Sequence, residues 1–304
     1  MLKQLFRLAA MLLVLTGAVA LGACGGSGSN SNMSGNGALS LDITDTPVEG
    51  ASQVVVAFTG VDVMGPSGQM HLALASEKTV DLLTLQGNAS ASLLSGVTVP
   101  AGDYQWLRLD VDEANSFVVA TGGGKFPLKI PSGSESGLKL VSGFTVAQGG
   151  SSDFVVDFDL RKSLTLDHGA GGALTYTLTP ALRLTDMQQV GTVSGTVAST
   201  LSLGGTLITA TDCEPAVYVY IGSGIKPEGY DVTVSGGTSP LTSAKVSLDA
   251  TSGDYVYTVS FLAPGTYTLA AVCAGADTTG ATTLAFSPAK TATVTANNTV
   301  TVNF

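Results

Sequence analysis

The chain has 304 residues, enough for one to three domains, and its 23 acidic residues outnumber its 13 basic ones. Without Lys3 and Arg7, which lie in a segment that we expect to be removed, the net charge is −12. This negative charge argues against nucleic acid as a partner, because phosphates attract a basic surface. It also argues against electrostatic docking on anionic lipid.

The start of the chain has the order of a bacterial export signal. Two positive residues, Lys3 and Arg7, precede an apolar run from Leu8 to Ala20, and Leu-Gly-Ala then precedes Cys24. The apolar run is too short for a comfortable membrane span, so the sequence predicts a signal peptide over residues 1–23. The alternative is an ordinary signal peptide whose cleavage site adjoins a free cysteine.

Leu-Gly-Ala followed by Cys24 resembles the lipobox of bacterial lipoproteins. The resemblance implies a diacylglyceryl group on the Cys24 thiol, cleavage before it and acylation of the new N-terminus, so that the membrane contact is the lipid itself. Gly25 stands where the enterobacterial sorting scheme has an inner-membrane Asp, which favours the outer membrane of a Gram-negative bacterium. Residues 24–37, rich in Gly, Ser and Asn, predict a flexible tether.

The rest of the chain has the pattern of β-strands. Apolar and polar residues alternate, as at Leu39, Leu41 and Ile43, and Phe154, Val156 and Phe158 likewise share one face of a predicted strand. Turn signals, such as Gly65–Gly68, recur about every 8–12 residues. A short helix within Leu82–Leu94 is the one exception that we expect. The sequence therefore predicts an all-β fold of two tandem β-sandwich domains.

The two domains are predicted at residues 38–188 and 189–304, because each range holds its own complete series of strands. The second range has its strongest strands around Ala263-Pro264-Gly265. It is expected to close with a hairpin turn at Asn297-Asn298.

Several blocks of the first range resemble DUF4382, a bacterial domain of unknown function, over residues 39–186. The resemblance implies a β-sandwich and no established activity. The matching blocks are Leu41–Val48, Val56–Val63, Val80–Gly87, Pro100–Val111, Gly137–Val146, Val156–Ser163 and Leu178–Asp186.

The second range is similar to transthyretin-like or carboxypeptidase-regulatory-like modules, through Gly191–Val197 and Leu262–Val272. That resemblance implies an immunoglobulin-like or transthyretin-like sandwich. Such folds host many functions, so it implies no particular one.

The chain has three cysteines, and lipidation of Cys24 would leave Cys213 and Cys273. An even pair in an oxidising compartment predicts a disulfide between them. The alternative is two unrelated buried thiols.

A catalytic centre is not predicted. The two histidines are His71, in a predicted strand, and His168, in a Gly-rich stretch, and no Gly-x-Ser-x-Gly motif accompanies them. We expect no catalytic residue and no cofactor.

Acidic residues cluster at three places, which are Asp42 with Asp45, Asp157 with Asp159, and Asp110 with Asp112 and Glu113. If two such strands were neighbours, their oxygens could converge on Ca²⁺. The alternatives are solubility or pairing with Arg108, Arg161 and Arg183. Zinc is disfavoured because the histidines lie far apart in sequence, so no metal site is expected.

The expected function is that of a non-enzymatic, membrane-anchored binding or structural module of the cell envelope, with an envelope protein or glycan as partner. A carbohydrate-binding protein is the alternative. In it Tyr104 and Trp106 would form a platform for a sugar, although packing in the core or at its rim also explains them.

Overall fold

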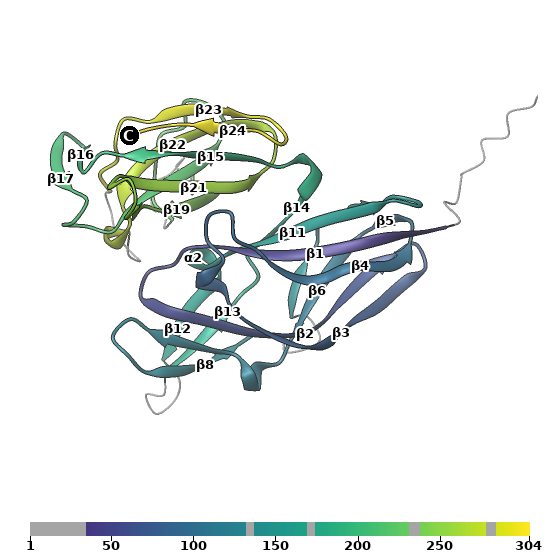
Figure 1. Cartoon of the computed structure of the whole chain (residues 1–304). Helices are drawn as coiled ribbons and strands as arrows, with labels where there is room; N and C mark the ends of the chain where they lie inside the picture. The colour runs from purple at the N-terminus through teal and green to yellow at the C-terminus, as the bar shows by residue number, and fades with distance from the viewer. Residues whose placement is uncertain (1–34, 132–136, 169–173, 231–237, 278–283) are drawn as a thin grey trace, which may run out of the picture. The chain divides into compact units, whose positions relative to one another are not determined.

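The computed structural model describes residues 35–131, 137–168, 174–230, 238–277 and 284–304 (Figure 1). Their regular structure is strands, one four-residue α-helix and four short 3-10 helices, so the predicted all-β class is confirmed. Residues 33–304 form one compact unit. Among the described residues, no helix is long and apolar enough to cross a membrane.

The first sheet is built on a parallel pair between β1 (Asn36–Thr46) and β11 (Ser151–Asp159). On the other edge of β1 lies β4 (Ala91–Pro100), and on the other edge of β11 lies β14 (Leu182–Asp186), both antiparallel. Figure 1 shows β1 running between β11 and β4. Residues more than a hundred positions apart in the sequence thus become neighbours.

β1 begins within the predicted tether, so the prediction of a tether up to Gly37 is wrong at its end. Asn36 pairs with Pro100, and Gly37 pairs with Val99. Gly37 is buried, and a Cβ there would collide with the carbonyl oxygen of Ala147. A glycine that looks like linker in the sequence is therefore needed for a close approach of two backbones.

The second sheet has eight strands in the order β12-β13-β8-β7-β2-β6-β9, with β3 also paired to β2. The β2–β3 hairpin confirms the predicted turn, since Gly65 lies opposite Gly68. The strands are β2 (Ala51–Gly65), β3 (Gly68–Asp81), β6 (Trp106–Val111), β7 (Phe117–Ala120), β8 (Lys125–Lys129), β9 (Leu138–Leu140), β12 (Leu164–His168) and β13 (Leu174–Leu178).

Two short strands, β5 (Gly102–Tyr104) and β10 (Phe144–Val146), form a separate pair beside these sheets. Tyr104 is buried, its ring stacks 4.8 Å from that of Phe144, and its hydroxyl donates to the Pro100 carbonyl at 2.8 Å. The short helices are η1 (Leu82–Thr84), η2 (Glu113–Asn115) and α2 (Leu160–Ser163). The helix expected within Leu82–Leu94 is thus a single 3-10 turn.

Apolar side chains from both sheets meet in one core. β1 contributes Leu39, Leu41 and Ile43, which alternate inward as the sequence predicts, and Phe58 and Phe158 pack edge to face at 6.2 Å. Each fully buried side chain of this size stabilises the fold by about 1.5–3 kcal/mol relative to exposure.

β11 departs from the alternation that its sequence suggests. Phe154, Val156 and Phe158 face the core as predicted, but Asp157 and Asp159 on the opposite face are also buried. Pairing with Arg183 is confirmed for Asp157, whereas the alternative of solubility, which needs an exposed face, is wrong for both residues. The reason is that further chain covers the outer face of the β1–β11 pair.

Residues 191–304 form two four-stranded sheets, in the orders β20-β21-β15-β24 and β19-β18-β22-β23, and one separate hairpin, β16–β17. A 3-10 helix, η3 (Met187–Gln189), precedes them, and η4 (Ala274–Ala276) follows β22. The strands are β15 (Gly191–Val197), β16 (Thr200–Leu203), β17 (Thr206–Thr209), β18 (Pro215–Ile221), β19 (Thr242–Lys245), β20 (Ser247–Leu248), β21 (Tyr255–Leu262), β22 (Gly265–Cys273), β23 (Lys290–Val294) and β24 (Thr299–Thr301).

The prediction of a hairpin at Asn297-Asn298 is wrong. β23 pairs with β22 in one sheet, whereas β24 pairs in parallel with β15 in the other. Asn297 adopts a left-handed φ of 57°, which Asn tolerates better than most residues, and the turn carries the chain from one sheet to the other. A turn signal in sequence marks a reversal of the chain but not which strands become partners.

The predicted disulfide between Cys213 and Cys273 is confirmed. Their Cα atoms are 5.5 Å apart, and Pro215, at the start of β18, lies opposite Cys273. The bond joins residues 60 positions apart. In the chain-entropy treatment, closing a loop of that length stabilises the folded state by about 4 kcal/mol, an upper figure.

Two sets of sheets with separate cores are consistent with tandem β-sandwich domains. The apolar side chains of one core come from residues 39–184. Those of two further apolar clusters come from residues 193–304. In the described part of the chain, no strand ladder joins the two sets. The boundary at residues 186–192 stays a prediction.

We expect fragments 33–188 and 189–304 to fold separately, because each keeps a complete set of sheets and its own core. Each fragment should show one cooperative thermal transition and dispersed amide signals. Both should be less stable than the full chain, since separation exposes contacts described below. A boundary in this place is contradicted if neither fragment shows a cooperative transition.

Candidate functional site

The parallel pairing of β1 with β11 brings two of the predicted acidic clusters together. In the register of this pair, Thr44 lies beside Asp157 and Thr46 lies beside Asp159, with Asp45 between them in sequence. Asp42 is not part of the group, because its carboxylate accepts from the Ser90 hydroxyl at 2.9 Å. The cluster is therefore Asp45, Asp157 and Asp159.

Two of these three carboxylates have a cation beside them. Asp157 pairs with Arg183 at 2.6 Å, and Asp159 pairs with Lys162 at 2.9 Å. Among the described residues no cation pairs with Asp45, and the residue is buried, with the backbone N–H groups of Thr46 and Leu160 beside its carboxyl group. Burial raises the pKa of the Asp45 carboxyl well above its ordinary value, and the charges of Asp157 and Asp159 raise it further.

The space beside Asp45 is small. A cavity of about 20 Å³ touches Asp45, Asp157 and Ser243. That volume holds about one water molecule. Carboxylates on neighbouring strands do come together here, as the calcium hypothesis requires. Asp157 and Asp159 are, however, already paired with Arg183 and Lys162. The arrangement favours a protonated Asp45 rather than an occupied calcium site.

The helix α2 follows directly and carries Arg161. Asp159 caps its N-terminus by accepting from the Lys162 N–H at 3.3 Å. The Arg161 guanidinium is buried, pairs with Glu49 and lies 3.8 Å from Asp277, with the rings of Tyr218 and Tyr230 about it. Through Asp277 this cation connects the part of the chain before residue 186 with the part after it, as do the hydrogen bonds from Lys162 to the Pro240 carbonyl and between the Thr46 and Thr242 hydroxyls.

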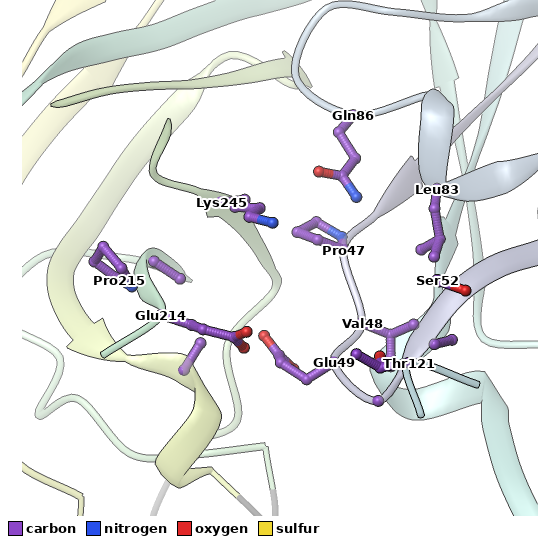
Figure 2. A pocket seen from close by; sticks show the side chains of 14 residues that line it. Pro47, Val48, Glu49, Ser52, Leu83, Gln86, Thr121, Glu214, Pro215 and Lys245 are labelled. Atoms are coloured by element: carbon purple, nitrogen blue, oxygen red, sulfur yellow. The ribbon is translucent and has the colours of Figure 1, made fainter. Parts of the chain in front are cut away.

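A cavity of about 370 Å³ lies next to the Arg161–Glu49 pair. Figure 2 shows the carboxylates of Glu49 and Glu214 pointing toward one another, with Lys245 and Gln86 near the same space. Its walls are a mixture of short apolar and polar side chains, and no aromatic residue lines it. The volume is within the range of small-molecule sites, and the lining suits a polar ligand.

A second polar group lies on the eight-stranded sheet, where β3, β2 and β6 are neighbours. His71 lies opposite Asp62 in the β2–β3 register, and Asp62 lies opposite Arg108 in the β2–β6 register. Asp110 follows two residues after Arg108 on the same strand and face. Three adjacent strands thus bring two carboxylates, an imidazole and a guanidinium together.

Each carboxylate of this group contacts both basic residues. His71 Nδ1 is 2.8 Å from Asp62 Oδ1 and 3.3 Å from Asp110 Oδ2. Arg108 pairs with the remaining oxygen of Asp62, and its Nε is 3.2 Å from Asp110 Oδ1. Burial raises the pKa of Asp110, as does the charge of Asp62, whereas Arg108 and His71 lower it.

The structure places the other candidate residues apart from these groups. Asp112 and Glu113 do not join Asp110, because Asp112 caps η2 and Glu113 accepts from the Ile130 N–H. His168 is the last residue of β12 and is exposed, so its prediction as a loop residue is wrong. Cys24 and the predicted signal peptide lie outside the described residues.

The sugar platform of the alternative function is not formed by Tyr104 and Trp106. Tyr104 is 2 % exposed and stacked in the core, whereas Trp106 is half-buried, with the Lys139 ammonium 4.1 Å from its ring centre. Of the two explanations that the sequence left open, packing therefore holds for Tyr104. Asp62 was not singled out from the sequence, although the predicted turn at Gly65–Gly68 already places it opposite His71.

Residues 36–180 match a family model described as a domain of unknown function, DUF4382. The matched range begins with β1 and ends two residues after β13. It agrees with the resemblance seen in the sequence apart from a few residues at each end. No curated protein is similar enough to match the chain.

Three solved structures illustrate the remaining similarities. The Bacillus anthracis TIE protein has 11% sequence identity and a TM-score of 0.21, and the match covers 89% of this chain and 34% of that one. GBS52, the minor pilin of Streptococcus agalactiae, has 12% identity and a TM-score of 0.20, and the match covers 87% of this chain and 94% of that one. The fimbrial anchor protein Mfa2 of Porphyromonas gingivalis has 11% identity and a TM-score of 0.17, and the match covers 79% of each chain. The chain spans about a third of the TIE protein's length. TM-scores this low carry no argument about function.

We expect Asp45→Asn to change how stability depends on pH. Between the ordinary Asp pKa and the raised folded-state pKa, the unfolded chain has lost a proton that the folded chain keeps. The stability of the wild type therefore falls through this group as pH rises above about 4, by up to about 1.4 kcal/mol per pH unit.

Asn carries no such proton, so Asp45→Asn should gain on the wild type as pH rises from 4 to 7. Denaturant unfolding at each pH unit measures the difference. Asp42→Asn, at a carboxylate of the same strand that is bonded to an exposed serine, is the matched control for the substitution itself. A difference for Asp45→Asn that stays constant from pH 4 to 7 would contradict the raised pKa.

Proposed function

We propose that this chain is a lipid-anchored, non-enzymatic binding or structural module on the outer membrane of a Gram-negative bacterium. The observation that carries the proposal is the order of the first residues, with a positive start, an apolar run, Leu-Gly-Ala and then Cys24. β1 starts at Asn36, so only 11 residues separate Cys24 from the first strand. Such a segment would hold the folded part a short distance from a membrane.

Two further observations support an extracytoplasmic location. The Cys213–Cys273 disulfide is of the kind that persists in oxidising compartments. The net charge of −12 after removal of the signal peptide leaves no basic surface excess to attract anionic lipid, so acyl chains would have to provide the anchor.

The absence of catalysis is part of the proposal, and the surroundings of the two histidines support it. A histidine base acts on a nucleophile within hydrogen-bond reach. His71 Nδ1 is engaged by two carboxylates instead, and His168 is an exposed strand end.

We propose that the partner, an envelope protein or glycan, occupies the cavity between Glu49 and Glu214. Its volume of about 370 Å³ and its polar walls suit a hydrogen-bonding group rather than an apolar one. Carbohydrate binding is the second candidate, favoured by the carboxylate, amide and hydroxyl groups of Glu49, Gln86 and Ser52 in these walls. Binding of the purified chain to a glycan array would distinguish it from protein binding.

We expect Cys24→Ser to abolish lipid attachment. The wild type should enter the detergent phase on Triton X-114 partition and incorporate labelled palmitate, whereas the variant should remain unprocessed or be soluble. Cys273→Ser is the matched control, since it removes a different cysteine and should keep the label. A Cys24→Ser protein that is still cut at the same place and still enters the detergent phase would refute the anchor.

We expect a photo-crosslinking amino acid at Ser52, on the cavity wall, to capture a defined envelope component in living cells. The same amino acid at Leu207, an exposed residue of the β16–β17 hairpin, is the control and should not capture it. Gel shift and mass spectrometry identify the product. Capture of the same component from both positions would show that the cavity is not its site.

A further inference from the structure

We propose that Asp62, His71 and Asp110 bind a divalent transition-metal cation, with Zn²⁺ the ion that the ligand set suits. The proposal goes beyond the envelope role, since these residues line a different cavity from the one at Glu49. In the described chain these three are the one group of histidine and acidic residues whose potential ligand atoms all lie within 4.8 Å of one another.

The spacing of the three atoms is close to what a cation requires. His71 Nδ1 lies 2.8 Å from Asp62 Oδ1 and 3.3 Å from Asp110 Oδ2. Ligands at about 2 Å from a tetrahedral zinc lie roughly 3.3 Å from one another. The two distances from His71 are therefore within about 0.5 Å of those around one tetrahedral ion, and the two carboxylates offer oxygens within 4.8 Å of one another.

Space for an ion and a further ligand is built into the backbone. β2 has a register irregularity between Phe58 and Gly60, and Gly60 lies opposite Asp110. A Cβ on Gly60 would lie 3.1 Å from His71 Nε2 and 3.2 Å from Asp110 Oδ2. Any residue larger than glycine would therefore displace the imidazole ring of His71. A cavity of about 320 Å³ adjoins the group and leaves one side of it open.

Arg108 supports the two carboxylates from the side away from the imidazole. It pairs with Asp62 and lies 3.2 Å from Asp110 Oδ1, so the oxygens that face His71 are held in place. Partners of this kind orient metal ligands in known sites. The charges of Asp62, Asp110 and Arg108 together give a net charge of about −1. A bound divalent cation would change this net charge to about +1.

The donor types select among cations. An imidazole nitrogen with two carboxylate oxygens suits Zn²⁺ and similar transition metals, whereas Ca²⁺ takes six to eight oxygens. The second oxygen of each carboxylate is engaged by Arg108, which prevents bidentate binding. We therefore infer that Ca²⁺ and Mg²⁺ bind this group more weakly than Zn²⁺.

The chain offers a matched pair of variants, because it has two histidines and both are exposed. Substitution at His71, whose side chain is 56% exposed, leaves the core intact. His71→Ala removes the proposed ligand, and His168→Ala removes the other imidazole at the end of β12. Asp110→Asn keeps the shape of the third ligand and removes its charge.

The full mature chain in detergent should take up one Zn²⁺ by isothermal titration calorimetry. In ¹H–¹⁵N spectra of the imidazoles, Zn²⁺ should shift His71 and leave His168 unchanged, and Ca²⁺ should shift neither. His71→Ala should abolish the calorimetric signal, Asp110→Asn should weaken it, and His168→Ala should preserve it.

Three results would overturn the proposal. They are the absence of saturable Zn²⁺ binding by the wild type, equal binding by His71→Ala, and a response of His71 to Ca²⁺ as large as to Zn²⁺. Thermal unfolding of each variant in a chelator shows whether the fold is kept. If His71→Ala proves unfolded, the Zn²⁺-induced shifts of the two imidazoles in the wild type decide by themselves.

Discussion

The parallel pairing of β1 with β11 is the constraint on which the first half of the structure depends. It joins residues 36–46 to residues 151–159 and so fixes the sheet that β4 and β14 extend. A parallel pair cannot be made by a tight turn, and here six of the eight strands of the second sheet lie in sequence between the two partners. The same pairing brings Asp45 beside Asp157 and Asp159, so the buried acidic cluster is a consequence of the topology.

Local features of this fold follow from the sequence, because short-range physics determines them. The alternation at Leu39, Leu41 and Ile43 places a β1 face in the core, and the turn at Gly65–Gly68 forms where glycine and proline predict it. Counting outward from that turn places Asp62 opposite His71. Half of the candidate metal site could therefore have been predicted from the sequence with no further information.

The remainder depends on pairings between distant segments, which alternation does not encode. Arg108 and Asp110 reach Asp62 because β6 pairs with β2, although 46 residues separate Arg108 from Asp62. The turn at Asn297-Asn298 looks like a hairpin but joins two sheets, since β24 pairs with β15 rather than with β23. Burial of Asp157 and Asp159 on the outer face of β11 similarly depends on which segments cover that face.

The two acidic groups differ in how their charge is balanced, and this difference indicates which of them can exchange a ligand. Asp45 has no cation of its own, because Arg183 and Lys162 pair with its neighbours, and the cavity beside it measures only about 20 Å³. A carboxyl group in that position has a lower free energy when it keeps its proton, because an unpaired charge in the protein interior is strongly destabilising. Asp62 and Asp110 instead share basic partners, and the exposed ring of His71 connects them to solvent. A ligand exchanges only at a group that solvent can reach, so the metal proposal concerns the group on β2, β3 and β6, whereas we expect Asp45 to act on the stability of the fold.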